Sequence, residues 1–316
     1  GGSGFIGTHL IALIDNLYPG TKIYNLDIVE NNHEGKSTYI NCDVRSEINI
    51  DIPVTSEDVI FNFAAVHRTP GHPDQAYFET NIRGAENVCA FAEKFGIKKI
   101  VFTSSIAPYG AAEDLKTEET LPTPNTPYGI SKLVAEKIHT IWQAKKLNER
   151  QLTIVRPGVV FGKGENGNFT RLYWGIRGGK FFYPGRKDTI KACIYVKELV
   201  RFMLYRLENH SEGVELYNCT FESAFTIEQI VETMKKATGL QRTIVKVPGS
   251  LLMTVASIVG PLGGKALGIC PARVKKLMIS TNICGKKLAD SGYKFHYTFE
   301  EAIKDWYRDN DGQCLR

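Results

Sequence analysis

Short apolar runs alternate with amphipathic stretches through the first half of the chain, and this alternation constrains the fold more than any other feature. The apolar runs cover 22–27, 59–65, 99–103 and 152–156, and the stretches with helical periodicity between them cover 8–17, 76–95 and 128–146. Buried strands separated by amphipathic helices are typical of a parallel sheet with helices on both faces. The sequence therefore predicts a doubly wound α/β fold.

A glycine motif stands before the first amphipathic stretch. The motif is Gly2-x-Gly4-x-x-Gly7, and Asp27 follows it by twenty residues at the end of the next apolar run. Glycines at this spacing allow a tight turn and close approach of the backbone to a pyrophosphate, and a carboxylate at the second strand end accepts hydrogen bonds from an adenosine ribose. Such a motif normally follows a strand, so we expect a first strand before the numbering begins. Because the carboxylate repels a 2′-phosphate, the predicted cofactor is NAD rather than NADP.

The composition excludes several classes of protein. The chain has 316 residues, of which 43% are hydrophobic, and its net charge of +5 is too small to indicate nucleic-acid binding. The seven cysteines are scattered without a C-x-x-C pair, which argues against a disulfide framework or a zinc site. No apolar run reaches the ~18 to 20 residues of a bilayer span. We therefore expect a cytoplasmic protein with a small-molecule substrate and no nucleic-acid, membrane or metal partner.

The sequence changes character after Pro157, where many glycines occur in the segment 158–185, which we interpret as loop-rich. We interpret 1–157 as a Rossmann domain for the dinucleotide and 158–316 mainly as a smaller α/β substrate lobe, with some segments returning to the sheet. The helices that we expect in the second part cover 196–208, 226–238, 251–259, 272–279 and 298–310. Thr226 resembles a helix start, although Glu228 and Gln229 do not make a strict capping box with it.

Tyr128 and Lys132 are four residues apart, so they share one face of a predicted helix. A free tyrosine titrates near pH ~10, and its use as a base near neutrality requires a shift of about three units, or roughly 4 kcal/mol. A neighbouring ammonium and a positive nicotinamide ring stabilise a phenolate and so lower its pKa. The pair is a candidate acid/base, and two ordinary surface residues are the alternative.

Six motifs follow one another in a characteristic order. They are Gly2-Ser3-Gly4-Phe5-Ile6-Gly7, Asp27, Asn62-Phe63-Ala64-Ala65, Thr103-Ser104-Ser105, Tyr128-Gly129-Ile130-Ser131-Lys132 and Arg156-Pro157-Gly158. Together they resemble the extended short-chain dehydrogenase/reductase family, and within it the NAD-dependent nucleotide-sugar epimerase/dehydratase group. The resemblance covers essentially the whole chain and implies an NAD-dependent enzyme that forms a homodimer.

The resemblance also implies roles for single residues. Tyr128 would be the acid/base, Lys132 would lower its pKa and hold the nicotinamide ribose, and Ser105 would hydrogen-bond the reacting oxygen. The implied cofactor contacts are Gly1, Gly2, Gly4, Phe5, Ile6, Gly7, Asp27, Asp43, Val44, Ala64, Ala65, Asn81, Tyr128, Lys132 and Pro157. Asp43 has a turn acid as its alternative, and Asn81 a solvent-facing helix residue.

In the second part, Asn168 lies where the epimerases place an asparagine near the sugar-nucleotide phosphates. The segment 191–198 looks like their Arg-x-x-x-His/Tyr-Val-x-Asp segment, with Lys191 for the arginine and Glu198 for the aspartate. A lysine neutralises a diphosphate as a point charge but lacks the planar, two-pronged grip of arginine. The predicted substrate contacts are Ser105, Asn168, Arg171, Lys191 and Arg273.

One departure from the family narrows the reaction. Sugar dehydratases of this group follow the active Ser/Thr with Asp-Glu, whereas this chain has Ile106-Ala107, and neither residue can move a proton. A nucleotide-sugar epimerase, acting at C4, is the interpretation that we favour. An NAD(P)-dependent keto-sugar reductase or a 3β-hydroxysteroid-type alcohol dehydrogenase is the alternative, and a non-catalytic cofactor-binding sensor is a second one.

Overall fold

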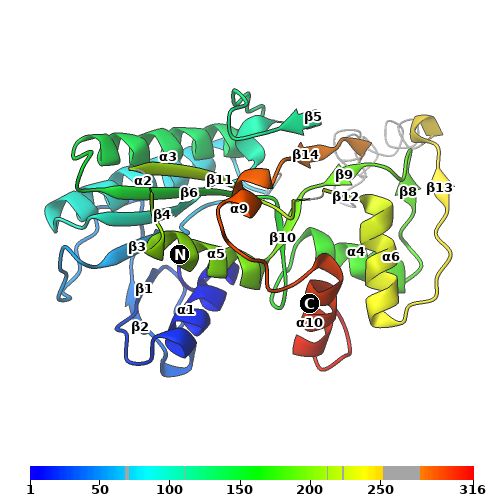
Figure 1. Cartoon of the computed structure of the whole chain (residues 1–316), viewed down its shortest axis with the longest axis horizontal. Helices are drawn as coiled ribbons and strands as arrows, with labels where there is room; N and C mark the ends of the chain where they lie inside the picture. Colours follow the sequence, from blue (N-terminus) through cyan, green and yellow to red (C-terminus); the bar gives the residue numbers. More distant parts are fainter. Residues whose placement is uncertain (68–70, 111, 212, 223, 252–277) are drawn as a thin grey trace.

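The computed structural model describes residues 1–67, 71–110, 112–211, 213–222, 224–251 and 278–316. Its central sheet has four parallel strands in the order β11-β6-β4-β3. These strands are β3 (Val59–Asn62), β4 (Lys99–Thr103), β6 (Gln151–Pro157) and β11 (Val214–Cys219). A separate parallel pair, β1 (Tyr24–Asp27) with β2 (Thr38–Asn41), lies beyond β3 (Figure 1).

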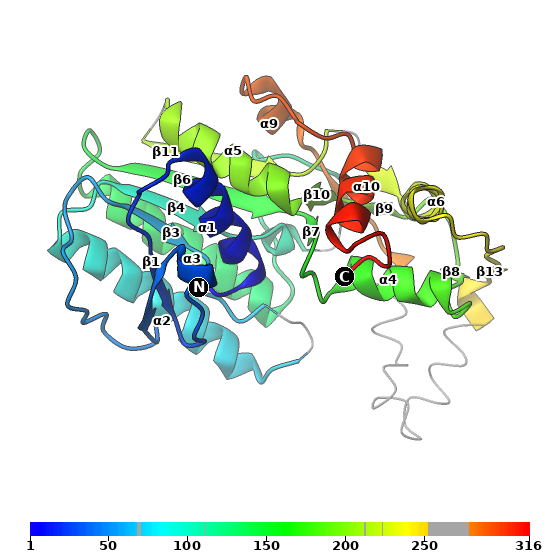
Figure 2. The same ribbon diagram turned by 90° about the horizontal axis from the view of Figure 1, so that it is seen from below.

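Four helices cover the two faces of this sheet, which confirms the doubly wound α/β fold. They are α1 (Phe5–Leu17), α2 (Asp74–Lys94), α3 (Pro127–Ala144) and α5 (Val196–Glu208). Helices α2 and α3 lie together on one face, and α1 and α5 lie on the other (Figures 1 and 2). Under α2 and α3, the core contains Ile100, Phe102 and Leu152 of the sheet. Apolar burial of this kind is the main stabilising contribution to such layers.

The glycine turn begins the first helix earlier than its periodicity predicts. Helix α1 begins at Phe5 rather than at residue 8, because the extended Gly4 is its N-cap. The turn lies between the two sheets: the Gly1 nitrogen is 2.5 Å from the Leu26 oxygen, and a Cβ on Gly1 would come within 2.5 Å of the Ala64 nitrogen. The strand that we expect before Gly1 stays a prediction.

The second part of the chain contains more regular structure than the glycine-rich sequence indicates. Its strands are β7 (Val159–Phe161), β8 (Tyr183–Pro184), β9 (Ile190–Lys191), β10 (Cys193–Tyr195), β12 (Phe225–Thr226), β13 (Lys246–Val247) and β14 (Thr281–Ile283). Its further helices are α4 (Asn168–Arg177), α6 (Ile227–Thr238), α9 (Lys286–Asp290) and α10 (Phe299–Asp309). The description of 158–185 as loop-rich is therefore wrong where β7 and α4 lie.

Smaller elements complete the described structure. They are β5 (Ala112–Lys116) and the two 3₁₀ turns His33–Gly35 and Ala107–Tyr109. Strand β5 joins the second part of the chain through a mixed sheet in the order β12-β9-β14-β5. The helices expected at 251–259 and 272–279 fall almost wholly outside the described residues. The boundary that we place after residue 157 stays a prediction.

Side-chain caps fix the starts of two helices in the second part. Thr226 and Gln229 form a complete capping box at α6, and Thr298 and Glu301 form one at α10. The prediction that Thr226 lacks a strict capping box is therefore wrong. Glutamine at the third helical position can reach back to the N-cap amide as glutamate does.

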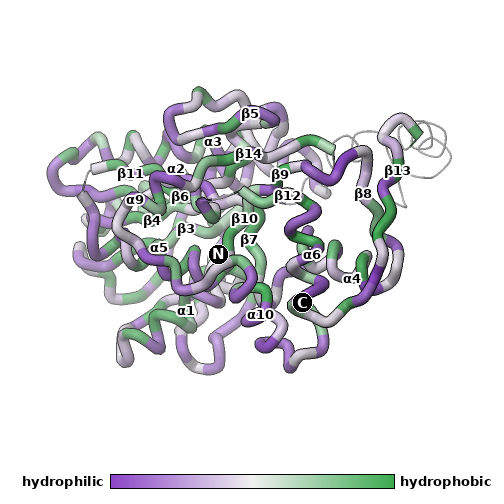
Figure 3. The backbone as a smooth tube through the Cα atoms, turned by 45° about the vertical axis from the view of Figure 1, so that its right-hand side comes forward, coloured by the Kyte–Doolittle hydropathy of each residue, from purple (hydrophilic) through white to green (hydrophobic). Residues whose placement is uncertain are grey.

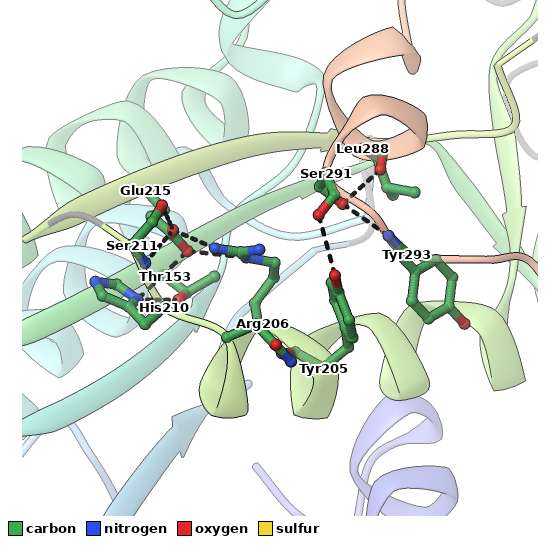
Figure 4. Close-up of polar contacts among 10 residues, drawn as sticks. Thr153, Tyr205, Arg206, His210, Ser211, Glu215, Leu288, Ser291 and Tyr293 are labelled. Atoms are coloured by element: carbon green, nitrogen blue, oxygen red, sulfur yellow. Dashed lines mark hydrogen bonds and ion pairs between the residues drawn. The ribbon is translucent and has the colours of Figure 1, made fainter.

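A buried ion pair joins α5 to the returning strand β11. The Arg206 guanidinium donates to Glu215, with Nε 3.1 Å from one carboxylate oxygen, and both side chains are almost fully buried. Ser211 donates to the same carboxylate at 2.9 Å. Figure 4 shows this cluster beside the hydrogen bond from the Tyr205 hydroxyl to the Ser291 carbonyl, 3.1 Å long. These contacts hold α5 between β11 and the segment after α9.

Candidate active site

The glycine turn presents an uncapped helix end. Helix α1 has no side-chain cap and no acidic residue in its first turn, so its first amides are free of a competing carboxylate. A Cβ on Gly2 would lie 2.3 Å from Asn25 Oδ1, and one on Gly7 would lie 2.5 Å from the backbone oxygen of Gly2. Glycine is therefore required at position 7, and a side chain at position 2 would displace Asn25. An open helix N-terminus on a tight glycine turn suits a pyrophosphate.

Asp27 lies beside this turn, as predicted. Its carboxylate accepts the Ser3 amide at 3.0 Å and the Val29 amide at 3.0 Å. The side chain is 12% exposed, which leaves room for a ribose hydroxyl at its edge. The turn and this carboxylate fit an adenosine diphosphate moiety such as that of NAD. Gly1, Gly2, Gly4, Phe5, Ile6 and Gly7 would surround the pyrophosphate.

Asp43 already has a partner in the structure. Its carboxylate accepts the Arg45 side chain, with Nε 2.9 Å from Oδ2, and also the Arg45 amide at 3.0 Å. The hydrogen bond from the Arg45 side chain lowers the pKa of Asp43. Val44 holds α2 through its carbonyl, which accepts the Asn87 amide nitrogen at 2.7 Å. Asp43 is thus a turn acid in the structure, and an adenine contact by Asp43 and Val44 stays a prediction.

Asn81 is a buried bridge rather than a solvent-facing residue. It is 3% exposed, and its oxygen accepts the Val66 amide at 2.8 Å. Its nitrogen donates to the Val66 carbonyl at 3.1 Å and to Ser131 Oγ at 2.9 Å. Asn81 therefore ties α2 to α3 and to the segment after β3, which contains Ala64 and Ala65. The alternative of a solvated Asn81 is wrong.

Tyr128 lies in the first turn of α3, where the Thr126 hydroxyl caps the helix by accepting the Gly129 amide at 3.1 Å. Burial raises the pKa of Tyr128, and a hydrogen bond with Ser105 opposes that rise. Ser105 follows the carboxyl end of β4, and Tyr128 lies at the start of α3. The end of a strand and the first turn of a helix therefore bring the two hydroxyls together. Tyr77 of α2 packs against Tyr128 with ring centroids 6.2 Å apart.

Lys132 lies one helical turn further along α3 and is only 2% exposed. Its ammonium donates to the Thr103 carbonyl at 2.6 Å and lies 4.4 Å from the Phe102 ring centroid. Burial lowers the pKa of Lys132 to about 7. The role of Lys132 in lowering the pKa of Tyr128 stays a prediction. In the structure the Ser105 hydrogen bond opposes the rise in the pKa of Tyr128.

Behind this pair lies a buried network that was not predicted from the sequence. Arg156 of β6 grips Glu136 of α3 with two nitrogens, at 2.8 and 2.6 Å, and Ser104 donates to the same carboxylate at 2.5 Å. The guanidinium also lies 4.7 Å from the Tyr109 ring centroid. The available signal was Arg156 at the end of the apolar run 152–156, because a charged residue on a buried strand needs a partner. Pro157 continues β6 beyond this network, and its carbonyl accepts the Ile106 amide at 3.3 Å.

The predicted substrate contacts are spread over several elements. Asn168 begins α4 and its Oδ1 accepts Arg171 Nη2 at 2.9 Å, so these two lie together. Glu165, which was not predicted from the sequence, caps the same helix by accepting the Thr170 amide at 2.8 Å. The Lys191 ammonium donates to the Ile279 carbonyl at 2.7 Å. Arg273 lies outside the described residues.

Glu198 has a structural role where the family has an aspartate. Its side chain is completely buried, and its carboxylate accepts the backbone amides of His296 at 2.6 Å and Tyr297 at 2.7 Å. The Tyr293 hydroxyl donates to the same carboxylate. The longer side chain thus anchors the segment that leads into α10.

A doubly wound fold with an open glycine turn and a half-buried tyrosine one turn from a buried lysine defines an NAD-dependent class of enzyme. Residues 1–220 match the model of the NAD dependent epimerase/dehydratase family. The chain belongs to this family, which is part of the extended short-chain dehydrogenase/reductase group.

Relatives are found among epimerases and steroid dehydrogenases. The chain is 33% identical over 306 residues to N-acetyl-alpha-D-glucosaminyl-diphospho-ditrans,octacis-undecaprenol 4-epimerase of Escherichia coli O157:H7, covering 96% of this chain and 91% of that protein. It is 25% identical over 340 residues to 3beta-hydroxysteroid-dehydrogenase/decarboxylase isoform 1 of Arabidopsis thaliana, covering 96% and 77%. The fold is similar to that of UDP-glucose 4-epimerase of Thermus thermophilus in complex with NAD, with a TM-score of 0.73, 18% identity and coverage of 99% and 98%.

Proposed function

We propose that the chain is an NAD-dependent 4-epimerase for a sugar that is joined to its carrier through a diphosphate. The observation that carries this proposal is the hydrogen bond between the half-buried Tyr128 and Ser105, one helical turn from the buried Lys132. The Escherichia coli relative, which is named for a diphospho-linked sugar, supports both the reaction and the substrate class. A nucleotide-sugar presents the same diphosphate and is the substrate that the sequence favours.

The chemistry of the proposal needs one group that moves a proton. Tyr128 takes the proton of the sugar C4 hydroxyl and returns it, while Ser105 donates a hydrogen bond to the same sugar oxygen. Bound NAD supplies reversible hydride transfer at that carbon. Ile106 and Ala107 offer no second acid, which agrees with a reaction that eliminates no water. Lys132 holds the nicotinamide ribose, and Asp27 holds the adenosine ribose.

The diphosphate of the substrate would lie at the start of α4. Asn168 and Arg171 supply an amide and a guanidinium there. Lys191 of strand β9 would supply a further positive charge to the substrate, and its ammonium also donates to the Ile279 carbonyl. Arginine and lysine both neutralise a diphosphate, but only arginine does so with two parallel hydrogen bonds.

A hydroxysteroid-type dehydrogenase is the second candidate. The Arabidopsis thaliana relative favours it, because its similarity extends over 96% of this chain. The same tyrosine, serine and lysine would serve both reactions. The two reactions differ in the fate of the reduced cofactor. In the epimerase it is reoxidised in the same turnover, and in the dehydrogenase it leaves the protein.

We also propose that the enzyme is a cytoplasmic homodimer. Three exposed apolar residues of α3, Ile130, Val134 and Ile141, are 40%, 36% and 60% exposed and lie at helical spacing on one face. The six cysteines of the described residues are free thiols, which suits a reducing compartment. Sedimentation of Ile141→Glu tests the dimer, since the charge should shift the protein to the monomer. An unchanged dimer would move the interface elsewhere.

The proposed reaction is tested with purified protein and added NAD. We expect UDP-N-acetylglucosamine, or N-acetylglucosamine linked by a diphosphate to a short polyprenol, to give its 4-epimer without net accumulation of NADH. Chromatography of the released sugars measures the product, and absorbance measures NADH. Stoichiometric NADH with a sugar or a sterol alcohol would favour the dehydrogenase instead. Bound NAD with no product from any of these would support the sensor.

A further inference from the structure

One end of the molecule carries an unusual run of positive charge. The segments 171–187 and 239–251 contain seven lysines and arginines and no aspartate or glutamate. Strand pairing joins them, because β8 pairs with β13 with Tyr183 opposite Lys246. We call these two segments the β8–β13 lobe. Its strands β8 and β13 lie at the edge of the molecule beyond α6 (Figure 1).

The lobe also exposes apolar side chains. Phe182 and Val245 immediately precede the paired residues of the two strands, and they are 37% and 62% exposed. Side chains alternate along a strand, so Phe182 points away from the core into which Tyr183 is buried. Trp174 at the end of α4 and Leu251 after β13 are also exposed. Figure 3 shows apolar stretches at β8 and β13 next to polar ones.

Five of the lobe's seven cations have no ion-pair partner among the described residues: Arg171, Arg177, Lys180, Arg242 and Lys246. By contrast, Arg186 pairs with Glu113 at 2.8 Å, and Lys187 pairs with Glu228 at 2.8 Å. The Arg177 guanidinium stacks on the Trp174 ring, with its carbon 5.1 Å from the ring centroid. The acids of neighbouring α6 are engaged by lysines, since Glu232 pairs with Lys235.

We propose that the β8–β13 lobe docks on the surface of an anionic phospholipid bilayer. Unpaired lysines and arginines are attracted to the negative surface potential of such a membrane. Exposed aromatic and branched apolar side chains among them fit the interfacial layer, where one side meets lipid and the other meets water. The proposed contact is peripheral, and among the described helices none is long and apolar enough to cross a membrane. The proposal departs from our sequence prediction, which included no membrane partner.

The position of the lobe relates it to the proposed substrate. Helix α4 runs from Asn168, where the diphosphate would lie, to Arg177 at the lobe. Ten residues of helix span about 15 Å. A lipid carrier attached to that diphosphate would therefore have a bilayer within one helix length. This relation rests on the proposed function, whereas the docking itself does not.

Vesicle binding tests the docking. The full chain is sedimented with vesicles of phosphatidylcholine alone and of phosphatidylcholine with about one third phosphatidylglycerol. We expect binding to the anionic vesicles only, and its loss at about 0.5 M salt because salt screens surface charges. Arg242→Glu with Lys246→Glu should weaken binding by about tenfold or more. Phe182→Ser with Val245→Ser should weaken it several-fold at unchanged net charge.

Matched controls keep the test specific. Lys22→Glu with Lys137→Glu reverses the same amount of charge on exposed lysines elsewhere, and Leu147→Ser replaces another exposed apolar residue. Both should bind as the wild type does. Absence of binding to anionic vesicles, or equal losses in lobe and control variants, would overturn the proposal. All variants are also assayed for 4-epimerisation of soluble UDP-N-acetylglucosamine, which lobe changes should leave intact. Loss of that activity in the wild type would contradict the proposed function without affecting the docking result.

Discussion

Two successive turns of α3 bury opposite charges in different surroundings. Lys132 has a backbone carbonyl as its hydrogen-bond partner and an aromatic ring beside it. Glu136, one turn later, is held by both nitrogens of the Arg156 fork and by the Ser104 hydroxyl. Both side chains are almost fully buried. The later turn is therefore neutralised and the earlier one is not.

The two turns of α3 differ in how their buried charges affect the stability of the folded state. A buried ion pair with all its hydrogen bonds made is costly to break, because removal of one partner leaves a buried charge. A buried ammonium without a carboxylate partner in contact destabilises the folded state, and the fall in the pKa of Lys132 to about 7 expresses that cost. Perturbed groups of this kind cluster at functional sites. We therefore propose that the turn that contains Tyr128 and Lys132 is the one that takes part in the reaction.

The largest effect expected is on activity, from Tyr128→Phe. The ring and its packing against Tyr77 remain, so stability should change little, whereas loss of the acid/base should lower kcat by about 10³- to 10⁴-fold. Initial rates of 4-epimer formation and thermal unfolding measure the two effects. Ser105→Ala is the matched control, and we expect about a tenfold loss from one missing hydrogen bond. Near-normal turnover by Tyr128→Phe would show that Tyr128 is not the acid/base of the reaction.

The next effect is on stability, from Arg156→Met at the neutralised turn. Because Glu136 would be left buried without its partner, the free energy of unfolding should fall by about 3 to 5 kcal/mol. Urea unfolding measures the change. The exposed pair Lys98–Glu57 gives the control, and Lys98→Met should change stability by less than about 1 kcal/mol. Equal small effects of both variants would show that the buried pair carries no special stability.

The turn with Tyr128 and Lys132 was predictable from sequence and the turn with Glu136 was not. The first pair is four residues apart on one helix, so local spacing places both groups. The second pair joins residues twenty apart on a helix and a strand, and only the packing of α3 against β6 brings them together. The contact between Tyr77 and Tyr128 was not predictable for the same reason, because the two residues lie on different helices.

Regular structure was also unevenly predictable. Strand β4 and helix α5 match their predicted bounds, because continuous apolar runs and strong periodicity mark them. Helix α4 was not predicted because glycines flank it, although its buried Phe169, Tyr173 and Ile176 recur at helical spacing. The start of α1 depends on the backbone of Gly4, which sequence periodicity does not report. Tertiary contacts and glycine conformations are what the sequence patterns leave out.

The smallest effect expected comes from Lys132→Met. This variant should raise the free energy of unfolding, whereas Arg156→Met should lower it. The pKa of Lys132 is about 7 in the folded protein and about 10.4 in an unfolded chain, so the unfolded state binds more protons between these values. Wild-type stability should therefore rise from pH 7 toward pH 10, and below pH 7 the full cost of the buried ammonium applies. The Lys132→Met variant should lose this part of the pH dependence. Its free energy of unfolding should exceed that of the wild type by about 1 to 2 kcal/mol near pH 6, because it no longer buries an ammonium. The gain is limited because the hydrogen bond to Thr103 is also lost. Urea midpoints measured from pH 6 to pH 9 on both proteins check the difference. Parallel curves would show that the ammonium costs the fold nothing, and the contrast with Glu136 would then be one of geometry alone.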